Sequence, residues 1–377
     1  MWVKISVVLA LLFVFCLPIS AQNSGADEAE KEFLDMTEAI PHDVARLLPK
    51  SIFEGSTQAA EGLDTTLDAD FWLDVVWNEL SGGMESVRPL LLSVLGMLIV
   101  SAILSSFKDA FRSEALSNAV SLAVSVVMVS LLVKNAALHI EAVTVYFERL
   151  YDFCLAMLPL MGALLAMGGS GMAAVAAHGG FLTVLGVLES FVGQSFRGIA
   201  GISLALTAAN SVSLKFRLSS LARAIRRVFA VFFSIVTAAL GFIVSIKIGL
   251  AAAGDSMAMR GARLFASNAI PIVGGAVGDS LRTLVTAISY IKSVSGVLGI
   301  VVILLLVLPV FLRVWMFRAC LVLLSGMAEI LGCEKERELL SGVVSVYGYM
   351  LAVLAVTAVI FIIMVTLFAK IAPAFGG

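Results

Sequence analysis

The sequence predicts an all-α, polytopic helical membrane protein with about six complete membrane spans. Hydrophobic residues make up 60% of the 377 positions and charged residues only 14%, whereas soluble domains are closer to half apolar and a quarter charged. The mean hydropathy is +1.04. Beyond residue 89, apolar stretches of about 20 residues, the length that crosses a bilayer, recur along the chain. Length alone would allow two soluble domains, but this composition does not.

The first 21 residues have the pattern of a secretory signal peptide. Lys4 precedes an apolar run over residues 5–17, and Ser20 and Ala21 provide small residues for cleavage. The alternative is that the segment is kept as an uncleaved anchor. In both cases we expect residues 22–88 to lie outside the cytoplasm.

Residues 22–88 form an acidic segment that contrasts with the rest of the chain. They carry 15 acidic and 4 basic residues, a net charge of −11, whereas residues 89–377, the predicted multi-span membrane domain, carry a net charge of +8. Phe33, Met36 and Ile40 share one face of a predicted helix.

The acidic segment has two open interpretations. About 65 residues with few large apolar groups make a marginal independent core, which favours a solvated tether. Asp70 can cap a helix that contains Trp72 and Trp77. Those tryptophans favour a docking segment that lies at the membrane surface or against a partner.

Basic residues predict the orientation of the spans, because basic loops stay cytoplasmic. The candidate spans are 89–107, 115–138, about 183–209, 228–250, 294–312 and 347–371. Lys108 and Arg112 follow the first span, and Arg313 and Arg318 form a smaller basic group. The strongest basic cluster, which we expect to form a cytoplasmic surface, contains Lys215, Arg217, Arg223, Arg226 and Arg227.

Two segments combine proline and glycine inside apolar sequence, which predicts re-entrant or broken helices. Proline removes a helix donor, and irregular backbone at membrane depth is tolerated only when it is buried in protein or lines a wet cavity. An even number of crossings must separate the cytoplasmic basic segments, so both segments should enter from the outer side and return. The candidate broken-helix core comprises Pro159, Gly162, Pro271, Gly274, Gly275, Gly278 and Asp279.

The two broken segments lie in similar surroundings, which favours a parallel internal repeat over residues 115–227 and 228–318. Each unit crosses outward, reaches a lysine (Lys134 or Lys247) and then a broken segment, and crosses back. Matching interrupted segments in two halves of a membrane protein indicate its working centre.

Two further segments are amphipathic or short. Residues 214–228 place apolar side chains at helical spacing with arginines on the opposite face. This pattern fits either a helix on the anionic cytoplasmic leaflet or a simple topology anchor. Residues 140–154 fit the outer surface. Residues 319–333 are apolar but too short to span comfortably, so their role and the side of the C-terminus stay open.

Glu189 and Arg197 are the ionisable residues within one predicted span. Such residues are usually paired or functional, and eight positions on one helix are too many for a direct pair. They could form interhelical bonds that fix packing, or they could line a conduit or ion site. Asp279 and Arg282 can pair with each other across one helix turn.

Signatures of enzymes and cofactors are missing from the sequence. It contains no nucleotide-binding loop, zinc-protease motif or serine-hydrolase elbow. The four cysteines and three histidines are scattered, without metal-ligand spacing. We therefore expect no catalytic residues, metal or cofactor, and no nucleic-acid partner.

A family resemblance rests on the leader, the acidic segment, the basic cluster and above all the segment Asn268-Ala269-Ile270-Pro271-Ile272-Val273-Gly274. In these features the chain resembles the stage III sporulation protein AE family of endospore-forming bacteria. The similarity covers about residues 25–372 and is strongest over 263–312. The resemblance implies a polytopic subunit of the channel-like complex that joins mother cell and forespore. The implied partners are other stage III A-operon proteins: membrane subunits, ring-forming proteins and a secretion-type ATPase.

The sequence thus favours a non-enzymatic membrane subunit of an export or channel assembly, in the mother-cell-derived membrane around the forespore. Two alternatives stay open. One is a secondary transporter acting alone, with Glu189 and Arg197 near a substrate site. The other is a passive membrane scaffold.

Overall fold

The computed structural model describes residues 27–106, 114–190, 195–212, 218–269 and 274–370, and the regular elements in these ranges are all helices. This confirms the all-α class. The predicted signal peptide lies outside the described residues and stays a prediction. The elements are a helix over 27–38, α2 (His42–Ala45), η1 (Lys50–Phe53), α3 (Ser56–Thr66), α4 (Ala69–Ser106), α5 (Glu114–Met167), α6 (Gly171–Leu188), α7 (Ser195–Val212), α8 (Leu218–Ala269), α9 (Gly274–Ile330) and α10 (Glu334–Lys370).

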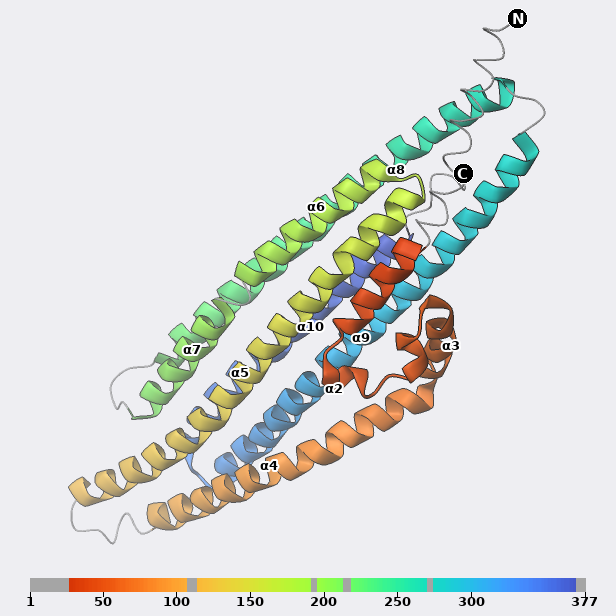
Figure 1. Ribbon diagram of the computed structural model, residues 1–377. Coiled ribbons are helices and arrows are strands. Elements are labelled where there is room, and N and C mark those ends of the chain that lie inside the picture. The colour runs from red at the N-terminus through yellow and green to blue at the C-terminus, as the bar shows by residue number, and fades with distance from the viewer. Residues whose placement is uncertain (1–26, 107–113, 191–194, 213–217, 270–273, 371–377) are drawn as a thin grey trace, which may run out of the picture.

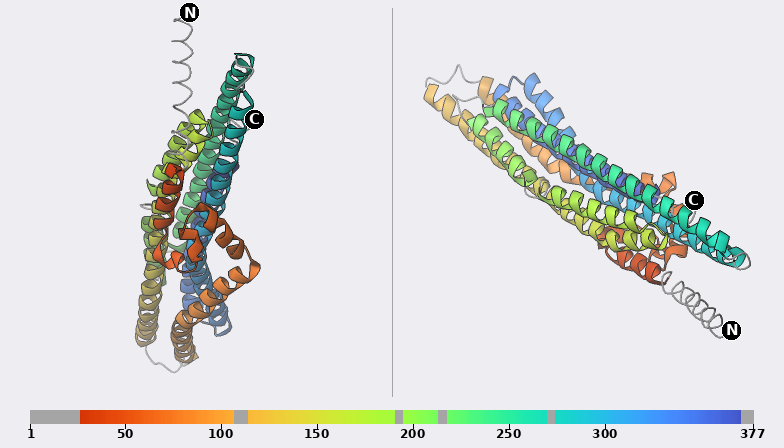
Figure 2. Two further views of the ribbon diagram at one scale, coloured as in Figure 1. Left: turned by 45° about the vertical axis from the view of Figure 1, so that its right-hand side comes forward. Right: turned by 90° about the horizontal axis from the view of Figure 1, so that it is seen from above.

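The long helices form one elongated bundle, in which the chain passes back and forth between two ends (Figures 1 and 2). At the α4–α5 end, on the lower left of Figure 1, α4, α7 and α9 finish and α5, α8 and α10 begin. At the opposite α8–α9 end, α5, α8 and α10 finish and α6 and α9 begin. The helix ends that flank the basic segments 108–112 and 215–227 therefore share one end of the bundle, whereas Arg313 and Arg318 lie inside α9.

Six helices of the described chain are long and apolar enough to cross a membrane, which confirms the polytopic membrane class. Several are far longer than a bilayer requires: α5 has 54 residues, α8 has 52 and α9 has 57. At a rise of 1.5 Å per residue each is roughly 80 Å long, whereas the hydrocarbon core is about 30 Å thick. The six spans are Ala69–Leu104, Leu122–Met167, Gly171–Leu188, Arg223–Ala258, Thr286–Ile330 and Glu334–Lys370.

The predicted spans do not lie level with one another along the bundle. The Tyr347 hydroxyl is 3.0 Å from Nδ1 of His139, so the start of predicted span 347–371 lies beside the end of span 115–138. Both α5 and α10 run away from the α4–α5 end. Span 115–138 is therefore closer to that end, and no single 30 Å slab contains both spans in full.

Prolines do not interrupt these helices. Pro89, Pro159 and Pro309 all lie inside helices, in α4, α5 and α9 respectively. The predicted break at Pro159 is therefore wrong, since α5 continues past it to Met167. Long apolar helices tolerate proline because neighbouring groups and local adjustments satisfy the freed carbonyl.

The break that ends α5 lies at residues 168–170, in the glycine run that follows Pro159 in the same predicted segment. Gly169 has φ 76°, a left-handed conformation that glycine adopts without steric cost. The N–H of Ser170 donates to the carbonyl of Leu165, and the N–H of Gly169 donates to that of Ala166. This pair of bonds is a Schellman motif, which ends α5 and reverses the chain into α6. Gly332, with φ 70°, reverses α9 into α10 in the same way.

The acidic N-terminal segment packs as a small helical unit against the bundle. Phe33, Met36 and Ile40, the predicted apolar face, are buried. Glu30 accepts hydrogen bonds from the N–H and the hydroxyl of Ser56 at 2.7 and 2.6 Å, which caps the start of α3. These contacts hold the unit together.

The same unit is docked on the chain's own long helices, so it is not a free tether. Asp43 pairs with Arg149 of α5 at 2.6 Å, and α3 packs against α9. Trp72 is partly buried against the core, whereas Trp77 is 72% exposed.

Candidate functional site

The predicted broken-helix core is only partly within the described residues. Pro159 is exposed on α5, and a Cβ at Gly162 would meet nothing within 4 Å, so neither marks a close helix contact. α8 ends at Ala269 and α9 begins at Gly274, and Pro271 between them lies outside the described residues. The surroundings of Gly274, Gly275, Gly278, Asp279 and Arg282 lie outside them too, so their role stays a prediction.

A carboxylate on α8 caps the helix that follows the observed break. Both carboxylate oxygens of Asp255 accept hydrogen bonds from backbone N–H groups at the start of α6, at 3.2 Å from Met172 and 2.8 Å from Ala173. Asp255 is buried, and Ser170 at the N-cap position makes no side-chain cap bond. A negative charge is favourable at a helix N-terminus, so Asp255 joins α6 to α8 near the α8–α9 end.

Glu189 and Arg197 are both exposed, and the structure does not pair them. The ion pairs within the described chain are Arg149–Asp43 and Arg337–Glu334. Glu189 does line a cavity of about 500 Å³, which we call the acidic cavity, and Arg197 does not. The cavity is bordered by Thr144, Phe147, Glu148, Leu150, Tyr151, Asp152, Leu188, Glu189, Thr357 and Phe361.

The predicted basic surface is only partly a surface. Lys215 and Arg217 lie outside the described residues, and Arg223 and Arg227 are exposed as expected. Arg226 is not: it is 4% exposed, so its assignment to an open surface is wrong. Polar side chains of membrane helices commonly face the protein interior, and of these three arginines Arg226 alone does so.

The apolar face of the same segment points outward. Leu221 and Val228, on the face opposite the arginines, are exposed at 52% and 69%. α8 is continuous through this region, so residues 218–228 are the first turns of a bundle helix. A separate interfacial helix is not present within them.

Arg226 borders a second cavity, of about 400 Å³, which we call the arginine cavity. It brings together Arg223 and Arg226 of α8 with Arg318 of α9, and polar side chains of α7 and α10 complete it. The Arg226 Nη2 group donates to the Ser345 hydroxyl at 2.9 Å. The lining residues are Thr207, Arg223, Arg226, Arg318, Glu338, Ser341, Gly342, Val344, Ser345 and Gly348.

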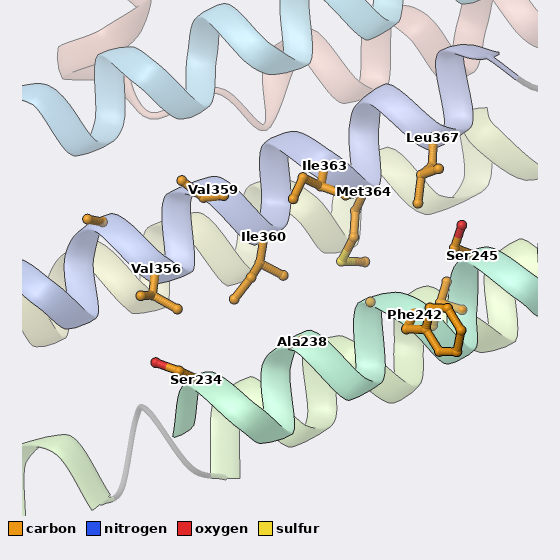
Figure 3. Close-up of a pocket in the computed structure, with 13 residues that line it drawn as sticks. Ser234, Ala238, Phe242, Ser245, Val356, Val359, Ile360, Ile363, Met364 and Leu367 are labelled. Atoms are coloured by element: carbon orange, nitrogen blue, oxygen red, sulfur yellow. The ribbon is translucent and has the colours of Figure 1, made fainter. Parts of the chain in front are cut away.

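Beyond the arginine cavity, an apolar groove of about 620 Å³ runs between α8 and α10 (Figure 3). Val356, Ile360 and Met364 of α10 face α8 across it, and Phe242 of α8 lies toward one end of it. The other lining residues are Ser234, Ala238, Gly241, Val244, Ser245, Ala355, Val359, Ile363 and Leu367.

Aromatic side chains fill the bundle centre near these cavities. The ring of His139 lies 4.2 Å from that of Phe317 and 5.5 Å from that of Tyr347. Phe196 stacks on Tyr349 at 5.7 Å. These contacts join α5, α7, α9 and α10, so the cavities have packed walls. Among the described residues, no group of three or more His, Cys, Asp or Glu is placed to hold a metal.

The fold and these internal polar cavities define a multi-span helical membrane protein with a charged interior. Comparison with known proteins then identifies the family. The model of the stage III sporulation protein AE family matches residues 58–372. The chain belongs to this family, as the sequence resemblance implied.

A curated relative supports the same assignment. The chain is 23% identical over 280 residues to the stage III sporulation protein AE of Bacillus subtilis (strain 168), an alignment that covers 73% of this chain and 69% of the relative. No solved structure matches the chain. Membership of this family makes the chain a membrane protein involved in sporulation.

Proposed function

We propose that the chain is a non-enzymatic integral membrane subunit of an export or channel assembly between mother cell and forespore. It would lie in the mother-cell-derived membrane around the forespore, with residues 22–88 on the extracytoplasmic side. Its partners would be other stage III A-operon proteins, including membrane subunits, ring-forming proteins and the secretion-type ATPase.

The observation that carries this proposal is the length of the exposed apolar surface. On α8, large apolar side chains are exposed from Leu221 to Met257, a distance of about 54 Å at 1.5 Å per residue. A tilt of about 40°, at the upper end for membrane helices, would still leave roughly 40 Å along the membrane normal. That exceeds the hydrocarbon core of about 30 Å.

A second exposed apolar surface, at the α4–α5 end, adds to the apolar length that exceeds the hydrocarbon core. The thiol of Cys333, in the turn between α9 and α10, lies 3.8 Å from the carbonyl oxygen of Leu98, so the rest of α4 projects past that turn. Ile103 of α4 and Val127 of α5 are each about half exposed in this region. Lipid can cover only part of so long a surface, and large exposed apolar patches mark protein interaction sites.

Co-purification with defined partners tests the proposal. The tagged chain would be purified from sporulating cells and from sister strains that each lack one other stage III A-operon protein. We expect one large complex, together with a loss of sporulation when the chain is deleted. A chain that migrates alone in every strain, while sporulation stays normal without it, would contradict the proposal.

One observation favours a second candidate, a secondary transporter acting alone. Glu189 lines the acidic cavity together with Glu148 and Asp152, and carboxylates inside a membrane bundle are suited to cations or protons. A transporter would move solute when the purified chain alone is placed in liposomes. Solute uptake that is lost in the Glu189→Gln variant would favour it over the assembly subunit.

A further inference from the structure

The arginine cavity contains buried donors that no described residue satisfies. Arg226 is 4% exposed, and its Nη1 group has no hydrogen-bond partner; neither has the buried Nε of Arg318. Leaving a buried charge without a counter-charge is strongly unfavourable. A polar partner that the described residues do not supply is therefore expected at this point.

The charge of the cavity indicates the sign of that partner. Three arginines line it, against one carboxylate, Glu338. The Oε1 atom of Glu338 also accepts a hydrogen bond from the Asn210 amide at 3.1 Å. The cavity thus has an excess of positive charge, and guanidinium groups bind the oxygens of phosphate well.

The apolar groove lies in line with the arginine cavity, farther along the same pair of helices. From Arg226 to Ser234 on α8 is about 12 Å, and the groove then extends about 18 Å from Ala355 to Leu367 on α10, at 1.5 Å per residue. One leaflet of the hydrocarbon core is about 15 Å thick. The groove therefore lies where the part of an acyl chain farther from the head group would reach, between α8 and α10 (Figure 3).

We propose that the arginine cavity and the apolar groove together bind one anionic phospholipid. Its phosphate oxygens would accept hydrogen bonds from Arg226 and Arg318, and an acyl chain would lie between α8 and α10. A lipid is favoured over a free phosphate because the two sites follow one another along α8 and α10 and because α8 exposes apolar residues such as Ile235 and Ile243 beside the groove. Basic pockets between membrane helices recognise phospholipid head groups by this chemistry.

Thermal unfolding of the full-length chain in mixed micelles tests the proposal. Phosphatidylglycerol and phosphatidylcholine with identical acyl chains would each be added to the purified protein. We expect phosphatidylglycerol to raise the Tm more, because a ligand that binds only the folded state stabilises it. In the Arg226→Met variant the apparent affinity for phosphatidylglycerol should fall about fivefold or more, on the basis of one arginine–lipid charge interaction.

Arg227→Met is the matched control, because Arg227 is the next residue, is exposed and lies outside the cavity. It should keep the wild-type response to phosphatidylglycerol. If Arg226→Met does not fold, Arg318→Met replaces it as the test. Equal phosphatidylglycerol responses in the wild type and in the folded cavity variants would overturn the proposal.

Two further arms distinguish a lipid from a free anion. Inorganic phosphate at matched ionic strength should raise the Tm far less than phosphatidylglycerol does; an equal rise would overturn the lipid assignment in favour of a free-anion site. Ala238→Phe, which fills the groove, should reduce the phosphatidylglycerol response and leave the phosphate response unchanged. A full phosphatidylglycerol response in Ala238→Phe would show that the groove is not part of the lipid site.

Discussion

The arginine cavity and the acidic cavity lie in one bundle, but the first contains a buried charged side chain and the second contains exposed ones. Both border α10, about 18 Å apart between Ser345 and Thr357 at 1.5 Å per residue. In the arginine cavity, Arg226 is buried and keeps an unsatisfied N–H group. In the acidic cavity, Glu148 and Glu189 are exposed.

The difference indicates around which cavity the stability of the fold depends more on close packing. Exposed carboxylates can meet partners from outside the bundle, so the acidic cavity needs no internal partner for them. The arginine cavity has packed walls, because α7 meets α10 there without space for a side chain at Gly342. Substitutions around the arginine cavity should therefore affect stability more than matched substitutions around the acidic one.

The largest effect is expected for Gly342→Val. A Cβ at Gly342 would collide with the side chain of Thr207, and overpacking of this kind typically costs about 1–3 kcal/mol. Unfolding of the detergent-solubilised protein would measure the loss. Thr207→Ala in the same chain should restore part of it.

Gly186→Ala is the matched control beside the acidic cavity. Gly186 lies in α6, and a Cβ there would meet nothing within 4 Å. Alanine has the higher helix propensity by up to about 1 kcal/mol, so the variant should be as stable as the wild type or more so. A loss at Gly186 as large as that at Gly342 would refute the contrast between the cavities.

A smaller loss is expected for Ser345→Ala. The hydroxyl of Ser345 accepts the hydrogen bond from Arg226, and hydrogen bonds to charged groups contribute about 1.5–3 kcal/mol in general, less where water enters. We expect a decrease of about 1–2 kcal/mol in the free energy of unfolding. In the Arg226→Met background, Ser345→Ala should cost much less, and an undiminished cost would show that the hydroxyl acts elsewhere.

The smallest effect is expected for Glu189→Gln. Its carboxylate is exposed on the rim of the acidic cavity, and such surface substitutions usually change stability by less than about 0.5 kcal/mol. Unfolding would check this directly. A clear destabilisation would mean that Glu189 has a structural partner, and the acidic cavity would then resemble the arginine cavity.

Composition and periodicity predicted the class and the course of the chain well. Apolar stretches predicted most of the long helices, although predicted span 183–209 is divided between α6 and α7. The basic segments at 108–112 and 215–227 predicted which helix ends lie together. The predicted break at Pro159 is wrong because proline need not end a long apolar helix in which neighbouring groups satisfy the freed carbonyl. In the structure, glycine at 169, in a left-handed conformation, is what ends the helix.

The interior of the site was less predictable, because burial depends on how helices rotate against one another. The arginine cluster was visible in the sequence, but that Arg226 faces inward was not. Asp255 and Lys292 are buried at positions that the sequence did not single out. Two features of the sequence point to the Asp255 cap. One is an acidic residue within an apolar helix, and the other is a glycine-rich start of a second helix.

The most direct test of the central claim asks what covers α8 in the assembled state. A photo-crosslinking amino acid would be placed in sporulating cells at Leu221, Phe242 and Met257, which are all exposed. Because this surface is longer than the hydrocarbon core is thick, we predict adducts with other proteins at Leu221, at Met257 or at both, and their loss in cells without the other stage III A-operon proteins. Adducts with protein at neither end of α8 would contradict the claim that the chain is a subunit of an assembly.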